Sequence, residues 1–133
     1  NAYLPILALV YLFLAPVVSR YVLHAEQYKE RTSIEAKIKS ETQATDRIYV
    51  WDNLTSSYKA SERLAASQLL SPRLHTGLDA NRTKLVNDLR DNQPKMIVVN
   101  TKTSLWTEVE QLLAENYQAV PSEYKDFKLY KLK

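Results

Sequence analysis

An unbroken apolar run near the start of the chain constrains its fold more than any other feature. Tyr3 to Val18 reads YLPILALVYLFLAPVV, sixteen positions without a charged side chain, whereas 25% of all residues are charged. A helix needs ~20 apolar residues to cross a hydrocarbon core about 30 Å thick. Because this run stops before Ser19 and Arg20, it is just short of one full span, and the sequence predicts a truncated transmembrane helix.

Two other interpretations of the apolar run stay open. A secretory signal peptide is disfavoured because nothing basic precedes the run and Val18-Ser19-Arg20 is a poor cleavage site. A buried helix of a soluble core is disfavoured by Pro5 and Pro16, since each proline removes a backbone hydrogen bond.

The chain is expected to have two parts. Asn1 and Ala2 resemble a cloning scar, which predicts that the natural protein continues upstream. Residues 1–19 are then the scar plus the end of the last transmembrane helix, and residues 20–133 form one domain, long enough for a single hydrophobic core.

Composition excludes several kinds of function. The chain has no cysteine and two histidines, so disulfides and thiolate chemistry are excluded and a three-ligand metal site lacks ligands. The single glycine, Gly77, excludes glycine-rich phosphate loops. Eighteen Lys and Arg are mixed with 15 Asp and Glu, which is no nucleic-acid footprint. We therefore expect no metal, no cofactor and no nucleic-acid partner.

Helical and extended patterns alternate along the domain. Apolar runs at 47–51 and 95–99 predict two central parallel strands, because each is followed by a helical segment and only a crossover joins them. Helices are predicted over residues 20–39, 56–70, 81–92 and 104–116, and extended pieces over 117–121 and 127–132. This order predicts an α/β fold, with a small mainly parallel sheet, helices on both faces and an antiparallel C-terminal edge.

Four stretches carry a resemblance to a known family: DRIYVWDNLTSSYKASERLAASQLLSP, DLRDNQPKMIVVN, LLAENYQAV and FKLYKLK. They resemble the C-terminal extracytoplasmic domain of bacterial GT-C type membrane glycosyltransferases, a group that includes relatives of the dolichyl-phosphate-mannose protein mannosyltransferases and the aminoarabinose transferases. The matching residues are Val50, Trp51, Tyr58, Ser61, Arg63, Ala66, Ser67, Pro94, Ile97, Val98, Val99, Asn116, Tyr117, Leu129 and Tyr130.

The resemblance implies a function for the whole protein. It implies an accessory extracytoplasmic domain, in the cell membrane, of an enzyme that transfers a sugar from a polyprenyl-phosphate donor to a glycan or protein acceptor. The family keeps its catalytic acids in an early loop absent from this sequence, so no catalytic residue is named. The alternative is a single-pass membrane-anchored α/β binding or interaction module. The lipid bilayer is the expected partner in either case.

One group of residues is a candidate substrate-binding corner. Trp51, Asp52, Tyr58 and Arg63 follow or flank the first strand, and open α/β sheets bind ligands at the carboxyl ends of their strands. The Arg63 guanidinium offers paired donors that suit a phosphate. The alternative is that Trp51 and Tyr58 pack in the core while Arg63 is solvated or pairs with Asp52.

Other candidates have simpler explanations. Asp46, Asp52 and Glu62 are acids that solvent readily accommodates in loops, and His75 lies in a predicted loop. A basic and aromatic set near the C-terminus is suited to anionic lipid headgroups, but a lysine-protected edge strand explains it equally. Its members are Tyr124, Lys125, Lys128, Tyr130, Lys131 and Lys133.

Overall fold

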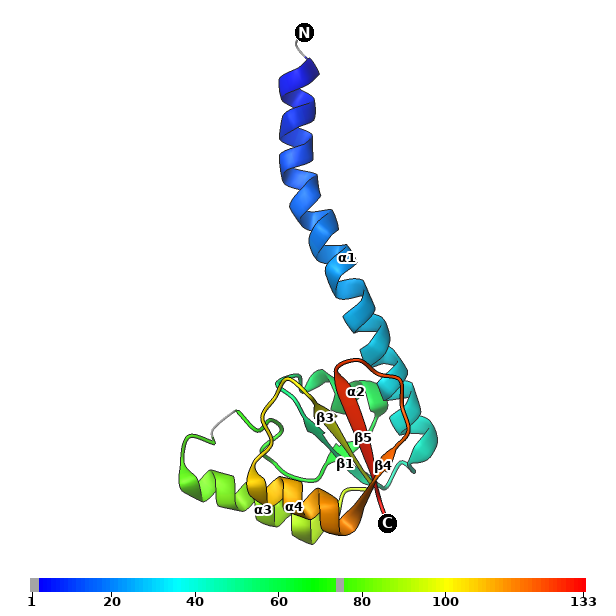
Figure 1. The fold of residues 1–133 in the computed structure, drawn as a ribbon, viewed down its shortest axis with the longest axis vertical. Coiled ribbons are helices and arrows are strands. Elements are labelled where there is room, and N and C mark those ends of the chain that lie inside the picture. Colours follow the sequence, from blue (N-terminus) through cyan, green and yellow to red (C-terminus); the bar gives the residue numbers. More distant parts are fainter. Residues whose placement is uncertain (1–2, 74–75) are drawn as a thin grey trace. The chain divides into compact units, whose positions relative to one another are not determined.

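The computed structural model describes residues 3–73 and 76–133 of the chain (Figure 1). The predictions for Asn1, Ala2 and His75 concern residues outside the described ones. The chain divides into two compact units, residues 1–34 and 35–133. The elements in order are α1 (Tyr3–Glu41), β1 (Arg47–Trp51), α2 (Ser56–Ser61), β2 (Leu64–Ala65), α3 (Asp79–Asn92), β3 (Met96–Asn100), α4 (Thr107–Asn116), β4 (Tyr117–Val120) and β5 (Phe127–Leu132).

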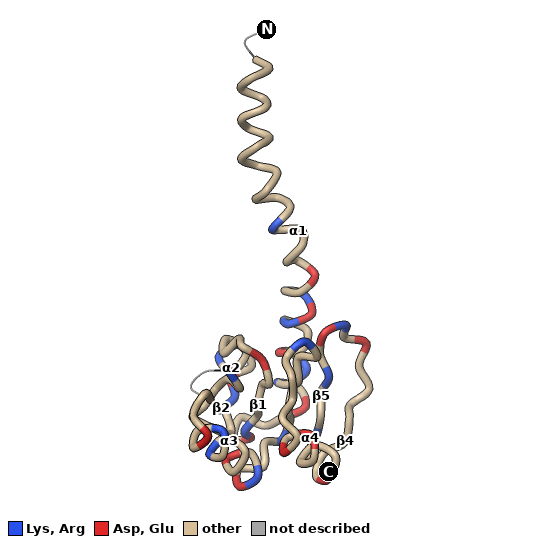
Figure 2. The backbone as a smooth tube through the Cα atoms, turned by 60° about the vertical axis from the view of Figure 1, so that its left-hand side comes forward, with Lys and Arg blue, Asp and Glu red and all other residues tan. Residues whose placement is uncertain are grey.

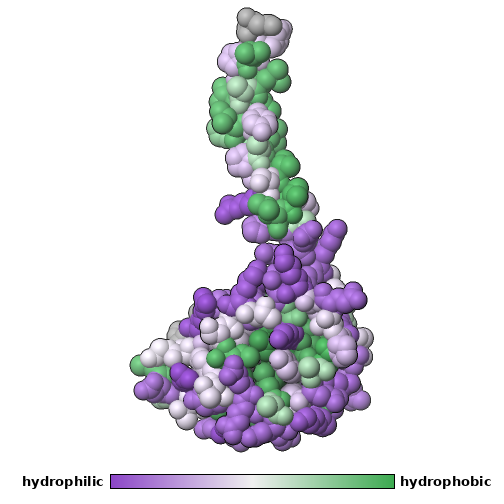
Figure 3. Space-filling view, viewed as in Figure 1, coloured by the Kyte–Doolittle hydropathy of each residue, from purple (hydrophilic) through white to green (hydrophobic). Residues whose placement is uncertain are grey.

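The described part of the first unit is helix α1 as far as Ile34, and the last residues of α1 belong to the second unit. No Lys, Arg, Asp or Glu marks the first part of α1 in Figure 2, and apolar side chains cover that part in Figure 3. The large side chains there are exposed, for example Leu4 at 70% and Phe13 at 73%. The interpretation as a buried core helix is therefore wrong. The helix is long and apolar enough to cross a membrane, as either an anchor or a signal sequence would be.

The second unit is built on a five-stranded sheet with the strand order β2-β1-β3-β5-β4. Strand β1 pairs in parallel with β2 and with β3, where Ile48 lies opposite Met96. Strand β5 pairs antiparallel with both β3 and β4. The predicted mainly parallel sheet, with two central parallel strands and an antiparallel C-terminal edge, is confirmed.

Both faces of the central strands are buried, which explains why the two apolar runs show no alternation. Tyr49, Trp51 and Ile97 face α3 and α4, where the main core cluster lies. The intervening residues of the same strands are also buried. On that opposite face, Lys131 of β5 forms a 2.9 Å salt bridge with Glu41 in the last turn of α1.

The predicted helix over residues 56–70 is wrong after Ser61. Helix α2 ends because Glu62 adopts a left-handed conformation with φ 56°, and its N–H bonds to the Lys59 carbonyl. The chain then turns into β2, where Leu64 pairs with Arg47. Helix-forming residues populate this stretch, but side-chain hydrogen bonds from distant residues hold it in an extended path.

The other predicted boundaries are correct to within a few residues. Helix α3 begins at Asp79 rather than after Asn81, and no side-chain hydrogen bond caps it. Helix α4 begins at Thr107 with Trp106 as its N-cap residue, so Ser104 does not cap it as predicted. The two closing extended pieces form the β4–β5 pair.

Candidate functional site

The strand order places a topological switch between β1 and β3. From β1 the chain moves to β2 on one side, whereas from β3 it moves to β4 on the other. Ligands of open α/β sheets bind outside the carboxyl ends of the strands at such a switch. Asp52 and Thr103 lie just past these two strand ends and are 5% and 8% exposed. The Asp52 carboxylate accepts a 2.6 Å hydrogen bond from the Asn53 N–H.

Trp51 links this edge of the sheet to helix α4. Its side chain is fully buried, and its indole Nε1 donates a 3.0 Å hydrogen bond to the Ser104 carbonyl. The ring meets Trp106 edge to face, with centroids 4.9 Å apart and planes at 89°. Edge-to-face pairs of this kind add to the stability that burial supplies. Trp51 therefore fixes the position of Trp106 at the start of α4.

Trp106 in turn holds an arginine of α3. The Arg82 guanidinium carbon lies 4.7 Å from the centroid of the Trp106 ring, within the range of a cation–π contact. Arg82 Nη2 also bonds to Glu108 Oε2 at 3.2 Å. The pKa of Glu108 is lowered, first by a hydrogen bond from its own backbone N–H and then by Arg82. Arg82 is thus held in one orientation by two contacts.

A groove of about 420 Å³ runs along α3 beside the start of α4, where the two helices lie side by side (Figure 1). We call it the α3–α4 groove. Its lining mixes positive, negative and neutral polar side chains around one valine: Asp79, Arg82, Thr83, Val86, Asn87, Arg90 and Glu108. The groove therefore offers charges of both signs at fixed places.

Tyr58 completes the hydrogen bonding of β1. Strand β2 has only two residues, so after Ile48 no strand pairs with β1 on that side. The Tyr58 hydroxyl then accepts a 2.9 Å hydrogen bond from the Val50 N–H and donates one of 3.3 Å to the Leu70 carbonyl. Burial raises the pKa of this phenol, against the effect of the Val50 N–H. The hydroxyl therefore supplies the acceptor that a neighbouring strand would otherwise give to the Val50 N–H.

Arg63 lies at the other end of the sheet. It directly precedes Leu64, which pairs with Arg47 at the amino end of β1, whereas Asp52 follows the carboxyl end. A five-residue strand separates the two ends by roughly 16 Å. The structure therefore does not bring Asp52 and Arg63 together, and their suggested pairing is wrong, whereas Tyr58 and Arg63 line one shallow pocket.

The guanidinium of Arg63 is fully engaged within the protein. Its five hydrogen bonds reach Thr42 Oγ1 at 2.8 Å and the carbonyls of Thr42 at 2.7 Å, Lys39 at 3.1 Å, Glu62 at 3.1 Å and Ser61 at 3.3 Å. A guanidinium has five N–H donors. Two of the acceptors are carbonyls at the end of α1, which a helix leaves unpaired. A ligand-binding role for Trp51, Asp52, Tyr58 and Arg63 stays a prediction. Each of these side chains forms at least one hydrogen bond within the protein.

The remaining sequence candidates are dispersed. Among the described residues no group of three His, Cys, Asp or Glu side chains is placed to hold a metal ion. Asp46 accepts a 2.7 Å hydrogen bond from the Gln43 N–H. Glu62 pairs with Lys39 at 2.8 Å. These acids do not converge with Asp52.

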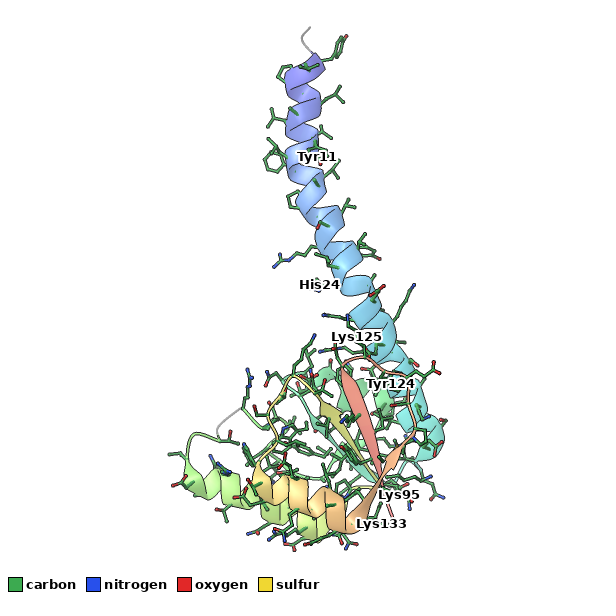
Figure 4. The ribbon with its side chains drawn as sticks, viewed as in Figure 1. Tyr11, His24, Lys95, Tyr124, Lys125 and Lys133 are labelled. Carbon is green, nitrogen blue, oxygen red and sulfur yellow. The ribbon has the colours of Figure 1, made fainter. Side chains whose placement is uncertain are left out.

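The basic and aromatic set near the C-terminus is not one patch. Figure 4 shows Tyr124 and Lys125 at one end of the sheet and Lys133 at the other. Lys133 Nζ donates to the Ala114 and Glu115 carbonyls at the end of α4, at 3.0 and 2.9 Å.

Sequence reasoning missed the contact of Arg82, Trp106 and Glu108. Arg82 is 26 residues from Glu108, and no spacing rule joins residues of two different helices at that distance.

Comparisons with known proteins correct the predicted family. The model of the family described as "Putative competence-induced protein Ccs4 C-terminal domain" matches residues 28–133. No curated protein and no solved structure matches the chain. The resemblance to GT-C glycosyltransferases is therefore wrong, and with it the accessory role in sugar transfer and the mannosyltransferase-like class. The chain belongs to the family of the competence-induced protein Ccs4 C-terminal domain.

Proposed function

We propose that this chain is a membrane-anchored α/β interaction module. The observation that carries the proposal is the exposed apolar start of α1, described above. Sixteen helical residues rise ~24 Å, and burying each large apolar side chain in lipid gains ~1.5–3 kcal/mol relative to water. A polar domain attached to such a helix is held at the bilayer surface.

The α3–α4 groove is the binding surface of this module. Arg82 is already ordered by Trp106 and Glu108, so binding through it loses little side-chain entropy. Arginine is also enriched where interfaces concentrate their binding energy. Because the groove presents both signs of charge, its partner is a protein segment at the membrane that carries both signs as well.

The side of the membrane is a separate matter. An extracytoplasmic position was expected from the overturned resemblance, and Arg20, Lys29 and Arg31 after the apolar run are typical of a cytoplasmic segment instead. The chain has no cysteine, so Ser122→Cys, at an exposed position, provides one thiol for a membrane-impermeant maleimide. Labelling in intact cells supports an extracytoplasmic domain, and labelling only after lysis supports a cytoplasmic one.

The anchor is tested by vesicle flotation of the full chain. Wild type is expected to float with lipid vesicles and to resist carbonate extraction. Leu9→Arg with Phe13→Arg is expected to abolish flotation, since each arginine at the centre of a span costs ~2.5–3.5 kcal/mol. The matched pair Leu9→Ala with Phe13→Ala keeps the helix apolar and is expected to float. Flotation of the arginine variant would refute the anchor.

The groove is tested by photo-crosslinking in cells. A photoreactive residue at Thr83, in the groove, is expected to give a discrete adduct with a second protein. The same residue at Gln111, on the exposed side of α4, is the control. Arg82→Ala is expected to remove the adduct formed at Thr83. Equal adducts from both positions, or an adduct that Arg82→Ala leaves unchanged, would contradict the groove as the binding surface.

A further inference from the structure

We propose that one face of α1, just after the apolar run, binds the headgroups of anionic lipids. The face consists of Arg20, Tyr21, His24, Tyr28 and Lys29, and we call it the basic–aromatic face. This inference rests on the proposed membrane anchor. It assigns a ligand class to a part of the chain that the α3–α4 groove does not involve.

Helical spacing brings these five side chains together. At 100° per residue, residues 20, 21, 24 and 28 fall within about 100° of one another, and Lys29 borders this face, about 80° from Tyr21. They line a single shallow strip along α1. Tyr21 and Tyr28 are 80% and 73% exposed, so two aromatic rings project into the surroundings of the helix within two turns.

Acidic side chains in this stretch lie on the other face. At 100° per residue, Glu26 is about 160° from Tyr28, and Glu30 is also about 160° away from it. The two acids therefore lie away from Tyr28, whereas Lys29 lies between Tyr21 and Glu26, about 60° from Glu26. Mixed charge in the sequence conceals this arrangement, because Glu26 and Glu30 alternate along the chain with Lys29 and Arg31.

Each residue type of the basic–aromatic face suits the interfacial layer of a bilayer. Tyrosine places an apolar ring against the acyl chains and its hydroxyl at the headgroups. Lysine and arginine near an anionic surface each contribute to its attraction. Arginine at the end of a span extends its side chain to the phosphates while its stem stays in lipid. The basic–aromatic face is thus complementary to lipid phosphates.

Position along the helix brings the face within reach of the headgroups. Arg20 follows the last residue of the apolar run, Val18, by two positions, and Tyr28 follows it by ten, a rise of ~15 Å. Side chains of a helix point back toward its N-terminus, which here is toward the bilayer. Transmembrane helices are tilted by ~20° on average. Such a tilt brings the side chains on the lower face of the helix closer to the bilayer surface.

The experiment compares lipid preference in membranes that already contain the full chain. The protein is reconstituted into phosphatidylcholine vesicles, and the association of spin-labelled phosphatidylglycerol is measured relative to spin-labelled phosphatidylcholine. Arg20→Gln with Lys29→Gln is expected to lower the preference for phosphatidylglycerol at least threefold. The upper limit of the expected loss is about 5-fold for each charge removed. The control Lys125→Gln with Lys128→Gln removes the same charge from the domain and is expected to preserve the preference.

Flotation of each sample separates this inference from the anchor. A chain that does not float refutes both. A chain that floats but shows no preference, or loses it equally in the domain control, refutes the headgroup site alone. Ala25→Cys tests the competing occupant, because Ala25 lies on the same strip. Efficient disulfide dimers through that cysteine in neutral vesicles would mean that the face packs against a second protein helix, which also overturns the inference.

Discussion

Replacing Arg63 with alanine removes a side chain that joins the end of α1 to the turn before β2. Arg63 is 8% exposed. Three of its five hydrogen bonds are buried, to Thr42 Oγ1, the Thr42 carbonyl and the Ser61 carbonyl. A buried polar atom left without its partner costs ~1–3 kcal/mol.

The expected loss of stability follows from these contacts. Alanine leaves a space that water enters, so we take the low end of that range for each buried acceptor and obtain ~3 kcal/mol. The lost positive charge at the C-terminal end of α1 adds to this, since helix ends of that polarity favour cations. For a unit of about 100 residues, this loss lowers the melting temperature by ~12–24 °C.

Thermal and urea unfolding of the full chain in detergent micelles measure the effect. Arg63→Lys keeps the charge but not the fork of donors, and an intermediate loss is expected. Arg47→Ala is the matched control, because Arg47 is exposed and makes one 3.0 Å bond to the Ala65 carbonyl. Its expected change is within about 0.5 kcal/mol. If Arg63→Ala changes stability no more than Arg47→Ala, the reasoning is refuted.

Two further predictions concern single polar groups. Tyr58→Phe is expected to cost ~2 kcal/mol, because the buried Val50 N–H loses its acceptor; a change equal to that of Tyr21→Phe, at an exposed tyrosine, would contradict this. Burial raises the pKa of Asp88, but hydrogen bonds from Lys84 and Ser67 outweigh burial and hold the pKa below its usual 3.8. Asp88 therefore contributes stability that is present above pH ~4 and is lost as the pH falls through its folded-state value. Melting temperatures from pH 2 to 6 should show the wild type losing its advantage over Asp88→Asn toward low pH, and a constant difference would refute this role.

The central strands were predictable from the sequence because their signal is local. Residues 48–51 and 96–99 are short apolar runs without alternation, and the structure buries them on both faces. The continuous helix through residue 39 was predictable for the same reason, since no glycine or proline interrupts residues 20–39. Where the hydrophobic pattern and the residue propensities agree with the tertiary structure, the sequence is sufficient to predict the helix or strand.

The predicted corner was not found because contacts between residues far apart in the sequence determine where Arg63 lies. Helix-forming residues follow Ser61, but the left-handed Glu62 and the buried Arg63 redirect the chain. That turn sends Arg63 to the amino end of β1, away from Asp52. No sequence pattern shows that Thr42, 21 positions earlier, supplies acceptors for Arg63. Contacts between distant residues decide this region, and they also decide the groove at Arg82.

The Tyr58 hydroxyl has a consequence for how this protein behaves at high concentration. Beyond Ile48, β1 has no strand on the side of β2, and an open strand edge is a template on which other chains add. Here a phenolic oxygen occupies the Val50 N–H that a foreign strand would otherwise use. Removing this one oxygen should therefore do more than lower the melting temperature. It should leave the edge of β1 open to pairing with strands of other molecules. The expected result is slow aggregation of a domain that is still folded.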